Sequence, residues 1–412
     1  MFFCKKIRPI TAKQRKITLD LNFNKTKGEF VNQRNVALNG TGLSSTFALT
    51  KMPFYFKVDQ AFRFYGDKLY LLAEHGVFGY LDDDYAYRLA NNTYKTISHV
   101  IYQDALVFSC STGTYSTVDG VESNKMTSAY FTCLEVYGDR IFGINGKQLY
   151  MTKAGDIRRW DETVNITAHS ELDALVALDK LYILGDTCYT LKADGLDYNM
   201  KFEPFGYNVG KVQTFSVAKL GKRAIFASTN GLYEVKNNTL SAIFTQLNDF
   251  VSFDGAVACV HNGKYYIACK RKDGDQLVND ILLELDVDSN RIVAVLDAKV
   301  ENICSTDGKI YAVIGNMLYV NTDEPTVSCY CKTVDFKTSD VKYLDRLIVR
   351  TKSDLEVWID NGTENRRYKV CGKNTTQRLP ITGAGRQFTV SVQSQGNMQL
   401  DSMELSARTY EV

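Results

Sequence analysis

The sequence between Tyr65 and Val320 repeats one phrase seven times: a tight polar turn, a short run of aromatic and β-branched residues, and a second strand-like run. The copies align on one turn residue each: Asp67, Asp104, Asp139, Asp179, Gly221, Gly263 and Gly308. The second runs cover residues 77–80, 148–150, 188–191, 231–235, 281–285 and 317–320. Successive copies are about 35 to 45 residues apart, close to the length of one propeller blade. The period therefore predicts a seven-bladed β-propeller, and six to eight blades are compatible with it.

Each copy carries the residues that a propeller blade needs. Asp-Lys, Gly-Lys and Asp-Gly-Lys turns tolerate a positive φ or hydrogen-bond their own backbone, so the chain can reverse between antiparallel strands. The next strand is apolar on both faces, as at residues 69–72 and 181–184, whereas a strand with one wet face would alternate apolar and polar residues. Such strands must be covered on both sides. Radial repetition of sheets provides that cover and leaves few open edges.

Composition and length predict an all-β chain in three parts. Tyr and Phe occur 25 and 22 times, Pro only 5 times, and no long segment has apolar residues at helical spacing, so we expect almost no helix. Residues 1–58 are predicted to form an extended N-terminal arm and a lead-in that could supply a strand to close the ring. Residues 59–324 are predicted to form the propeller, which Asp323-Glu324-Pro325 ends. Residues 325–412 are predicted to form a small, sandwich-like all-β domain.

Within residues 325–412 we expect alternating strands at 344–350, 355–359, 367–370, 377–381, 387–392 and 398–407. The first two are predicted to form a hairpin around Thr351-Lys352-Ser353-Asp354, and Asp360-Asn361-Gly362 to turn the chain again. Both turns are rich in residues that hydrogen-bond their own backbone.

The formal net charge of +2 argues against a protein whose main task is to bind nucleic acid, because such affinity rests on neutralising many phosphates. The one basic concentration precedes any strand-like pattern: Lys5, Lys6, Arg8, Lys13, Arg15 and Lys16. We expect these residues in an arm that contacts DNA or an acidic partner, or that stays solvated.

The sequence carries no targeting or disulfide signal. Charged residues follow Met1-Phe2-Phe3-Cys4 at once, so no secretory signal is expected, and no run of 18 apolar residues predicts a membrane span. Ten cysteines are scattered along the chain, where buried thiols act as small hydrophobes. Cys329-Tyr330-Cys331 directs two thiols to one face of a strand, which is poor geometry for a mutual disulfide and lacks further zinc ligands.

Residues with the chemistry of an active site are sparse. Four histidines fall in different blades without metal-ligand or nucleophile spacing: His75, His99, His169 and His261. Asp82-Asp83-Asp84 could coordinate a hard cation or act on a substrate, but a solvated loop between blade strands is the simpler interpretation. Asp286-Val287-Asp288-Ser289-Asn290 starts like a calcium loop but lacks the glycine and the closing Glu, so we expect a hairpin turn.

The motifs of known propeller enzymes and arrays are absent from the sequence. Trp160-Asp161 imitates a WD dipeptide once, without the Gly-His partner of a WD40 blade. There is no Gly-rich phosphate loop and no Gly-x-Ser-x-Gly elbow, and residues 152–160 hold the residue types of a sialidase Asp box in the wrong order. A carboxylate pair assembled across blades would escape this search. We predict a non-enzymatic protein without a cofactor or metal.

Several phrases mark an order of N-terminal lead-in, blade repeats and β-rich end: NKTKGEFVNQR (24–34), GDKLY (66–70), KYLDRLIV (342–349), DNG (360–362), GRQF (385–388) and LDSMELSAR (400–408). This order resembles the propeller-bearing neck and tail proteins of tailed bacteriophages, of the packaged-DNA stabilisation (tail hub) and tail nozzle types. The resemblance spans most of the chain and brings no catalytic residues.

The resemblance implies a virion structural protein in a symmetric neck or tail ring that retains or conducts packaged DNA. It implies a homo-oligomer with neighbouring neck and tail proteins as partners, made in the host cytoplasm. The basic arm would then face DNA, without sequence preference, or an acidic neighbour.

Two other classes of function stay open. A carbohydrate- or receptor-binding propeller would stack exposed aromatic side chains on sugar rings, and Tyr85, Tyr87 and Tyr115 are the candidates, although aromatic residues in blades more often pack the core. A cellular scaffold propeller, whose loops bind partners, is the third possibility. Binding to a glycan array would favour the first of these, and ring formation would favour the phage protein.

Overall fold

A computed structural model of the chain is all-β in the residues that it describes, apart from two 3₁₀ turns, η4 (Thr214–Ser216) and η5 (Thr245–Leu247). Those residues are 13–20, 33–39, 42–53, 58–64, 68–73, 76–82, 85–88, 96–118, 122–160, 166–193, 200–306, 308–326, 328–332, 336–373 and 375–411. The chain divides into two compact units: unit 1 holds residues 1–47, 294–296 and 324–412, and unit 2 holds residues 48–293 and 297–323. The prediction of an all-β chain is confirmed.

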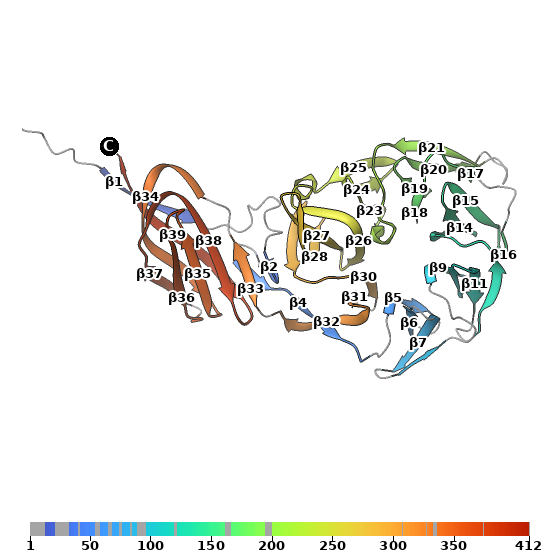
Figure 1. Cartoon of the computed structure of the whole chain (residues 1–412), viewed down its shortest axis with the longest axis horizontal. Coiled ribbons are helices and arrows are strands. Elements are labelled where there is room, and N and C mark those ends of the chain that lie inside the picture. The colour runs from blue at the N-terminus through green and yellow to red at the C-terminus, as the bar shows by residue number, and fades with distance from the viewer. Residues whose placement is uncertain are drawn as a thin grey trace, which may run out of the picture. The chain divides into compact units, whose positions relative to one another are not determined.

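Unit 2 is a β-propeller, in which antiparallel sheets stand around a common centre (Figure 1). The first two sheets are β5 (Val58–Phe64), β6 (Lys68–Ala73), β7 (Gly76–Asp82) and β8 (Tyr85–Arg88), then β9 (Thr96–Tyr102), β10 (Ala105–Cys110), β11 (Gly113–Thr117) and β12 (Asn124–Thr127). The third is β13 (Cys133–Tyr137), β14 (Arg140–Asn145), β15 (Gln148–Lys153) and β16 (Asp156–Trp160), with β17 (Ile166–Thr167) beside β15.

The chain continues around the ring with the same arrangement. The next two sheets are β18 (Leu172–Ala177), β19 (Leu181–Gly185), β20 (Cys188–Ala193) and β21 (Met200–Gly206), then β22 (Ala218–Leu220), β23 (Arg223–Ser228), β24 (Gly231–Lys236) and β25 (Thr239–Ile243). The strands β26 (Val251–His261), β27 (Lys264–Asp273), β28 (Gln276–Asp286) and β29 (Arg291–Leu296) pair in sequence order. The last sheet is β30 (Asn302–Thr306), β31 (Lys309–Ile314) and β32 (Met317–Pro325), completed by β4 (Phe47–Lys51).

The turns of the sequence repeat that the structure describes join the first and second strands of these sheets, and the turn at Asp67 lies outside the described residues. The described turn at Asp179 has no residue with positive φ, and such residues occupy the other five: Gln103 (47°), Asp104 (61°), Gly138 (62°), Gly221 (61°), Asn262 (48°), Gly263 (73°) and Gly308 (66°). The second runs of the repeat are the third strands β7, β15, β20, β24, β28 and β32. The prediction from turn chemistry is confirmed, because tight hairpins need the left-handed conformation that Gly, Asn and Asp tolerate.

The second strands are buried on both faces, as their two-sided apolar runs predicted. All residues of β10 and β19 are buried, and all but one of β14 and β23. Neighbouring sheets meet through these strands. Tyr70 and Leu72 of β6, for example, lie in one buried cluster with Leu106 and Phe108 of β10. Apolar burial between sheets therefore holds the ring together.

Contacts between the first and last sheets close the ring. Leu71 of β6 lies in one buried cluster with Tyr311 of β31 and Leu318 of β32. Units that line up end to end without returning are thereby excluded. The lead-in supplies a strand as expected, since β4 pairs with β32 and the N–H of Met52 donates to the carbonyl of Leu318 (2.9 Å).

Hydrogen bonds join sheets at two further junctions. The hydroxyl of Tyr265, on β27, donates to the carbonyl of Ser216 in η4 (2.7 Å). Nδ1 of His261, on β26, lies 2.9 Å from Oγ of Ser305 on β30. Polar groups that would otherwise be buried without partners are paired here, which fixes how these sheets pack.

Unit 1 is built from strands at both ends of the chain. They are β1 (Lys13–Asp20), β2 (Val36–Asn39), β3 (Gly42–Ser45), β33 (Cys329–Lys332), β34 (Phe336–Thr351), β35 (Leu355–Asp360), β36 (Asn365–Val370), β37 (Thr376–Pro380), β38 (Ala384–Ser394) and β39 (Gln399–Glu411). β39 pairs with β1, β3 and β34, and β34 also pairs with β37 and β38. β38 pairs further with β33 and β35, and β35 with β36.

The hairpin predicted between residues 344–350 and 355–359 is wrong. β34 pairs with β37, β38 and β39, whereas β35 pairs with β36 and β38, so the chain changes partners at the turn between them. The hydroxyl of Thr351 holds that turn against β39. It donates to the carbonyl of Gln399 (2.9 Å) and accepts the N–H of Ser353 in the turn (3.1 Å). The turn predicted at 360–362 is present, and Oδ1 of Asn361 accepts the N–H of Glu364 there (2.7 Å).

The N-terminal part of the chain is divided differently from the prediction. Residues 1–47 belong to unit 1, and β4 belongs to the propeller, so residues 1–58 do not form one separate segment. β1 pairs with β39 along its whole length, where an extended arm was expected, and β2 pairs with β29 and β3. The strand partners of this segment lie hundreds of residues further along the chain, and no local pattern identifies them.

Candidate functional site

The basic N-terminal residues fall into two groups. Three lie outside the described residues: Lys5, Lys6 and Arg8. Three lie on β1: Lys13, Arg15 and Lys16. In the pairing with β39, Lys13 stands opposite Glu411 and Lys16 opposite Arg408. The backbone of this half of the predicted contact arm is thus hydrogen-bonded into a sheet, which a freely extending arm would not be.

The fold separates charge that the sequence mixes. Unit 1 contains 22 Lys and Arg and 13 Asp and Glu, a formal charge of +9, and unit 2 contains 27 and 34, a charge of −7. Together they give the chain's net charge of +2. The small net charge is therefore the sum of a basic unit, which attracts anionic partners, and an acidic propeller, which attracts cationic ones.

A pocket of about 630 Å³ opens on unit 2, among loops at strand ends of neighbouring sheets. Its lining is Thr132, Gly146, Ser170, Glu171, Leu172, Asp173, Asp186, Gly210, Lys211 and Thr214. Asp173 Oδ2 accepts the N–H of Val212 (2.8 Å), and Asp186 Oδ1 accepts that of Gly210 (2.9 Å). Burial raises the pKa of Asp173, against the opposing effects of the Val212 hydrogen bond and the charge of Lys211. These carboxylates fasten one sheet to the next.

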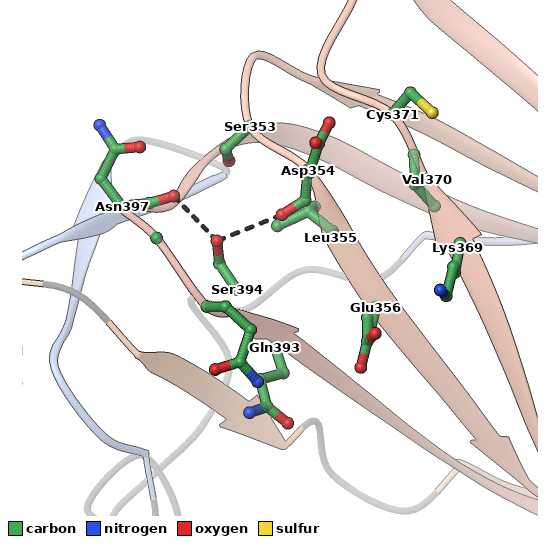
Figure 2. A pocket seen from close by; sticks show the side chains of 12 residues that line it. Ser353, Asp354, Leu355, Glu356, Lys369, Val370, Cys371, Gln393, Ser394 and Asn397 are labelled. Atoms are coloured by element: carbon green, nitrogen blue, oxygen red, sulfur yellow. Dashed lines mark hydrogen bonds between the residues drawn. The ribbon is translucent and has the colours of Figure 1, made fainter.

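A second pocket, of about 510 Å³, lies on unit 1 at the ends of β35, β36 and β38 (Figure 2). Its lining is Ser353, Asp354, Leu355, Glu356, Lys369, Val370, Cys371, Gln393, Ser394, Gln395, Gly396 and Asn397. The Ser394 hydroxyl lies between the carbonyls of Asp354 (3.2 Å) and Asn397 (2.9 Å), as the dashed lines show. The exposed thiol of Cys371 is at the same site, and Asp354 Oδ1 accepts the N–H of Gly372 (2.7 Å). The lining therefore mixes both signs of charge on a hydrogen-bonded frame.

The titratable residues singled out from the sequence are dispersed. His75, Asp83 and Asp84 lie outside the described residues, and His169 is exposed. The ring of His99 lies 4.2 Å from that of Phe62, and burial lowers the pKa of His99 to about 4. Among the described residues, no three His, Cys, Asp or Glu side chains are grouped so that they could hold a metal ion.

Two further sequence interpretations can be compared with the structure. Residues 287–290 form the turn between β28 and β29, and Oδ1 of Asp286 accepts the N–H of Ser289 in that turn (3.2 Å), so the hairpin turn predicted there is confirmed. Cys329 and Cys331 are both buried, as two thiols on the same face of β33.

Of the three aromatic candidates for sugar stacking, the structure describes the side chain of one. Side chains of Tyr85 and Tyr87 lie outside the described residues. Tyr115 stacks on Phe108 with ring centroids 5.8 Å apart, and its hydroxyl lies 3.1 Å from Oγ1 of Thr112. Its ring is thus engaged in packing between blade strands. No helix in the described residues is long and apolar enough to cross a membrane.

Sequence reasoning did not find either pocket. Their lining residues come from loops and strand ends scattered over residues 132–214 and 353–397, without a motif that joins them. The charge separation was partly visible, since the sequence already placed its one basic concentration at the N-terminus. The pairing of that segment with the C-terminal strands was needed to assign the charge to one unit.

Comparison with known proteins identifies the fold only. No family model and no curated protein matches the chain. Among solved structures, the extracellular domain of the proposed hybrid two component system BT3049 from B. thetaiotaomicron has a TM-score of 0.50 at 11% identity, covering 80% of this chain and 49% of that one. PorZ of the type-IX secretion system of Porphyromonas gingivalis has a TM-score of 0.46 at 12% identity, covering 78% and 46%. The chain therefore spans about half the length of these structures.

Proposed function

We propose that the chain is a non-enzymatic structural protein of a tailed-bacteriophage virion, one subunit of a symmetric ring at the neck or tail that retains or conducts packaged DNA. The observation that carries the proposal is the order of parts that resembles those phage proteins. In this chain the phrase at 342–349 lies on β34, the phrase at 400–408 lies on β39, and the phrase at 360–362 forms the turn after β35.

The finer architecture is part of the same proposal. We infer seven blades, by counting the path β26–β27–β28–β29 as one blade beside the six separate sheets of the described propeller. β4 then closes the ring by completing the last blade with a strand from the N-terminal lead-in. Unit 1 is inferred to be a sandwich with layers β1–β39–β34–β37 and β33–β38–β35–β36, supported by buried side chains such as Leu347 and Val357, one from each layer.

The separation of charge supports a structural role near DNA. A basic unit of +9 favours contact with a polyanion, while a propeller of −7 repels it, so any DNA contact would be made by unit 1. A subunit that seals or conducts DNA without sequence preference needs charge of this kind and no base-reading motif.

Two measurements on the phage that encodes the chain test the proposal. Mass spectrometry of gradient-purified particles should detect its peptides at a fixed, multiple copy number per particle. Particles made under a nonsense mutation in its gene should package DNA but lose it on dilution, and a plasmid copy should restore retention. If the peptides are absent from purified particles, the proposed function is wrong.

A further inference from the structure

We propose that copies of this chain associate head to tail, by pairing the exposed outer end of strand β28 of one copy with the edge strand β36 of the next. The proposal deepens the ring part of the proposed function by naming the two surfaces and the partner, a second copy of the chain. It rests on strand length, exposure and charge in the described residues.

The first surface is a projecting hairpin of unit 2. β27 and β28 run for 10 and 11 residues, whereas second strands such as β10, β14 and β23 have 6. β29 has only 6 residues and follows β28 through the turn at 287–290. It is therefore long enough to pair only with the half of β28 that lies next to this turn. Among the described residues, residues 276–280 of β28 have a strand partner, β27, on one side only, so on the other side they present backbone N–H and C=O groups.

The outer part of this hairpin also exposes apolar side chains. Leu277 and Val278 are 54% and 56% exposed, and as neighbours on a strand they point to opposite faces. Monomeric proteins usually protect an edge that is both unpaired and apolar. An edge with apolar groups on both faces suits a strand that is added to another sheet, where both faces become covered.

The second surface is β36 of unit 1. Within the described residues it pairs with β35 only, and it ends the sheet path β38–β35–β36. Asn365, Arg366 and Arg367 are exposed, and the guanidinium of Arg367 lies 5.6 Å from the ring centre of Trp358. The strand thus offers a free backbone edge beside a cation and an aromatic face.

Charge makes these two edges complementary. Residues 273–280 of the hairpin contain Asp273, Asp275 and Asp280 and no cation. Residues 365–370 of β36 contain Arg366, Arg367 and Lys369 and no carboxylate. The units that carry the edges have formal charges of −7 and +9, so long-range attraction acts in the same direction as the local pairing. Two copies of the same edge would place like charges together, which disfavours self-pairing of either one.

Both arginines already have carboxylate partners within their own chain. Arg366 pairs with Glu364 (2.6 Å), and Arg367 pairs with Glu356. The arginine side chains are 43% and 50% exposed, and solvent screens ion pairs of that kind, so these two pairs stabilise the fold little. These ion pairs hold both guanidinium groups at the edge of the sheet. A carboxylate of a second copy can bind beside Glu364 or Glu356, or replace it.

The contact is heterologous, since different surfaces of the two copies meet. Such contacts add subunits in one direction and close into a ring when the rotation between copies allows it. Strand addition supplies a directional backbone ladder, and the charges select the partner edge.

Charge reversal with rescue tests the contact on the full chain, by sedimentation velocity at about 50 mM and 300 mM salt. The wild type should form oligomers that weaken as salt rises, because the charged groups are exposed. Asp273→Lys with Asp275→Lys should weaken association about tenfold or more, and Arg366→Glu with Arg367→Glu should do the same. An equimolar mixture of the two double variants should associate again through the swapped pair. Asp139→Lys with Glu203→Lys, exposed on the same unit away from the hairpin, is the matched control and should assemble like wild type.

Three outcomes would overturn the contact. They are a wild type that stays monomeric at high micromolar concentration, hairpin variants that assemble as well as the control, and a mixture that does not recover. Circular dichroism of each variant should match wild type, because the changed side chains are exposed; a variant that unfolds is replaced by Leu277→Ser with Val278→Ser, which should weaken assembly through the same edge. The proposed function fails separately, when the chain is missing from purified particles whether or not it assembles in solution.

Discussion

Ring closure should depend on the cluster that joins the first and last sheets, and Leu71→Ala tests it. Leu71 is fully buried, and its cluster includes Tyr311 and Leu318 from the other end of the propeller sequence. Since these neighbours are fixed on strands of two sheets, they cannot collapse into the space that the smaller side chain leaves. We expect the free energy of unfolding to fall by about 3 kcal/mol, within the range for buried Leu→Ala changes. For a domain of this size the melting temperature should drop by about 6 to 12 °C.

Tryptophan fluorescence can follow unit 2 alone during denaturation with guanidinium. The chain has two tryptophans, Trp160 in unit 2 and Trp358 in unit 1, so Trp358→Phe leaves one reporter. Trp160 stacks on buried Phe131 with ring centroids 4.4 Å apart, and its emission should change when the sheets separate. Ile101→Ala is the control, because Ile101 is 45% exposed and should change stability by less than about 0.5 kcal/mol. Equal midpoints for the two alanine variants would refute closure by packing.

Three further variants probe the propeller. Gly143→Ala should cost about 1 to 3 kcal/mol in a thermal melt, because the new Cβ would lie 2.6 Å from the ring of buried Phe131. Tyr265→Phe should cost about 1 to 3 kcal/mol in a urea titration, because it leaves the carbonyl of Ser216 buried without its donor. Burial lowers the pKa of His99 to about 4, whereas in the unfolded chain it stays near 6.5. As pH falls from about 6.5 to 4, the unfolded chain therefore takes up a proton that the folded chain does not, and the folded chain loses stability. His99→Gln should remove that part of the pH dependence of the melting temperature.

Each of these variants has a matched control or a result that contradicts it. Gly396→Ala meets no atom within 4 Å and should be nearly neutral, unlike Gly143→Ala. Tyr207 is 64% exposed, so Tyr207→Phe should leave the urea midpoint unchanged. If Tyr265→Phe behaves in the same way, the hydroxyl does not contribute to the junction. An unchanged pH profile in His99→Gln would mean that the imidazole is solvated.

The sequence by itself determined the all-β class and the propeller. The features that determine a blade lie within about 40 residues of one another in each repeat. The turn residues accept a positive φ, and the strand that is apolar on both faces requires cover on both sides. The turn at Gly263, the buried strand at 181–184 and the turn at 287–290 could be predicted from the sequence for this reason. Local chemistry also allowed a lead-in strand to be expected at the closure of the ring.

Only the tertiary structure decided how the two ends of the chain share one unit. β1 pairs with β39, and β34 and β35 take separate partners, because strand pairing between distant segments is chosen by total burial and backbone hydrogen bonding and leaves no local pattern. The division into a unit of +9 and a propeller of −7 follows from that pairing. Both pockets, and the edges that β28 and β36 leave unpaired among the described residues, likewise depend on segments that only the fold brings together. Charge and concavity belong to surfaces, and surfaces exist only after distant segments have been brought together.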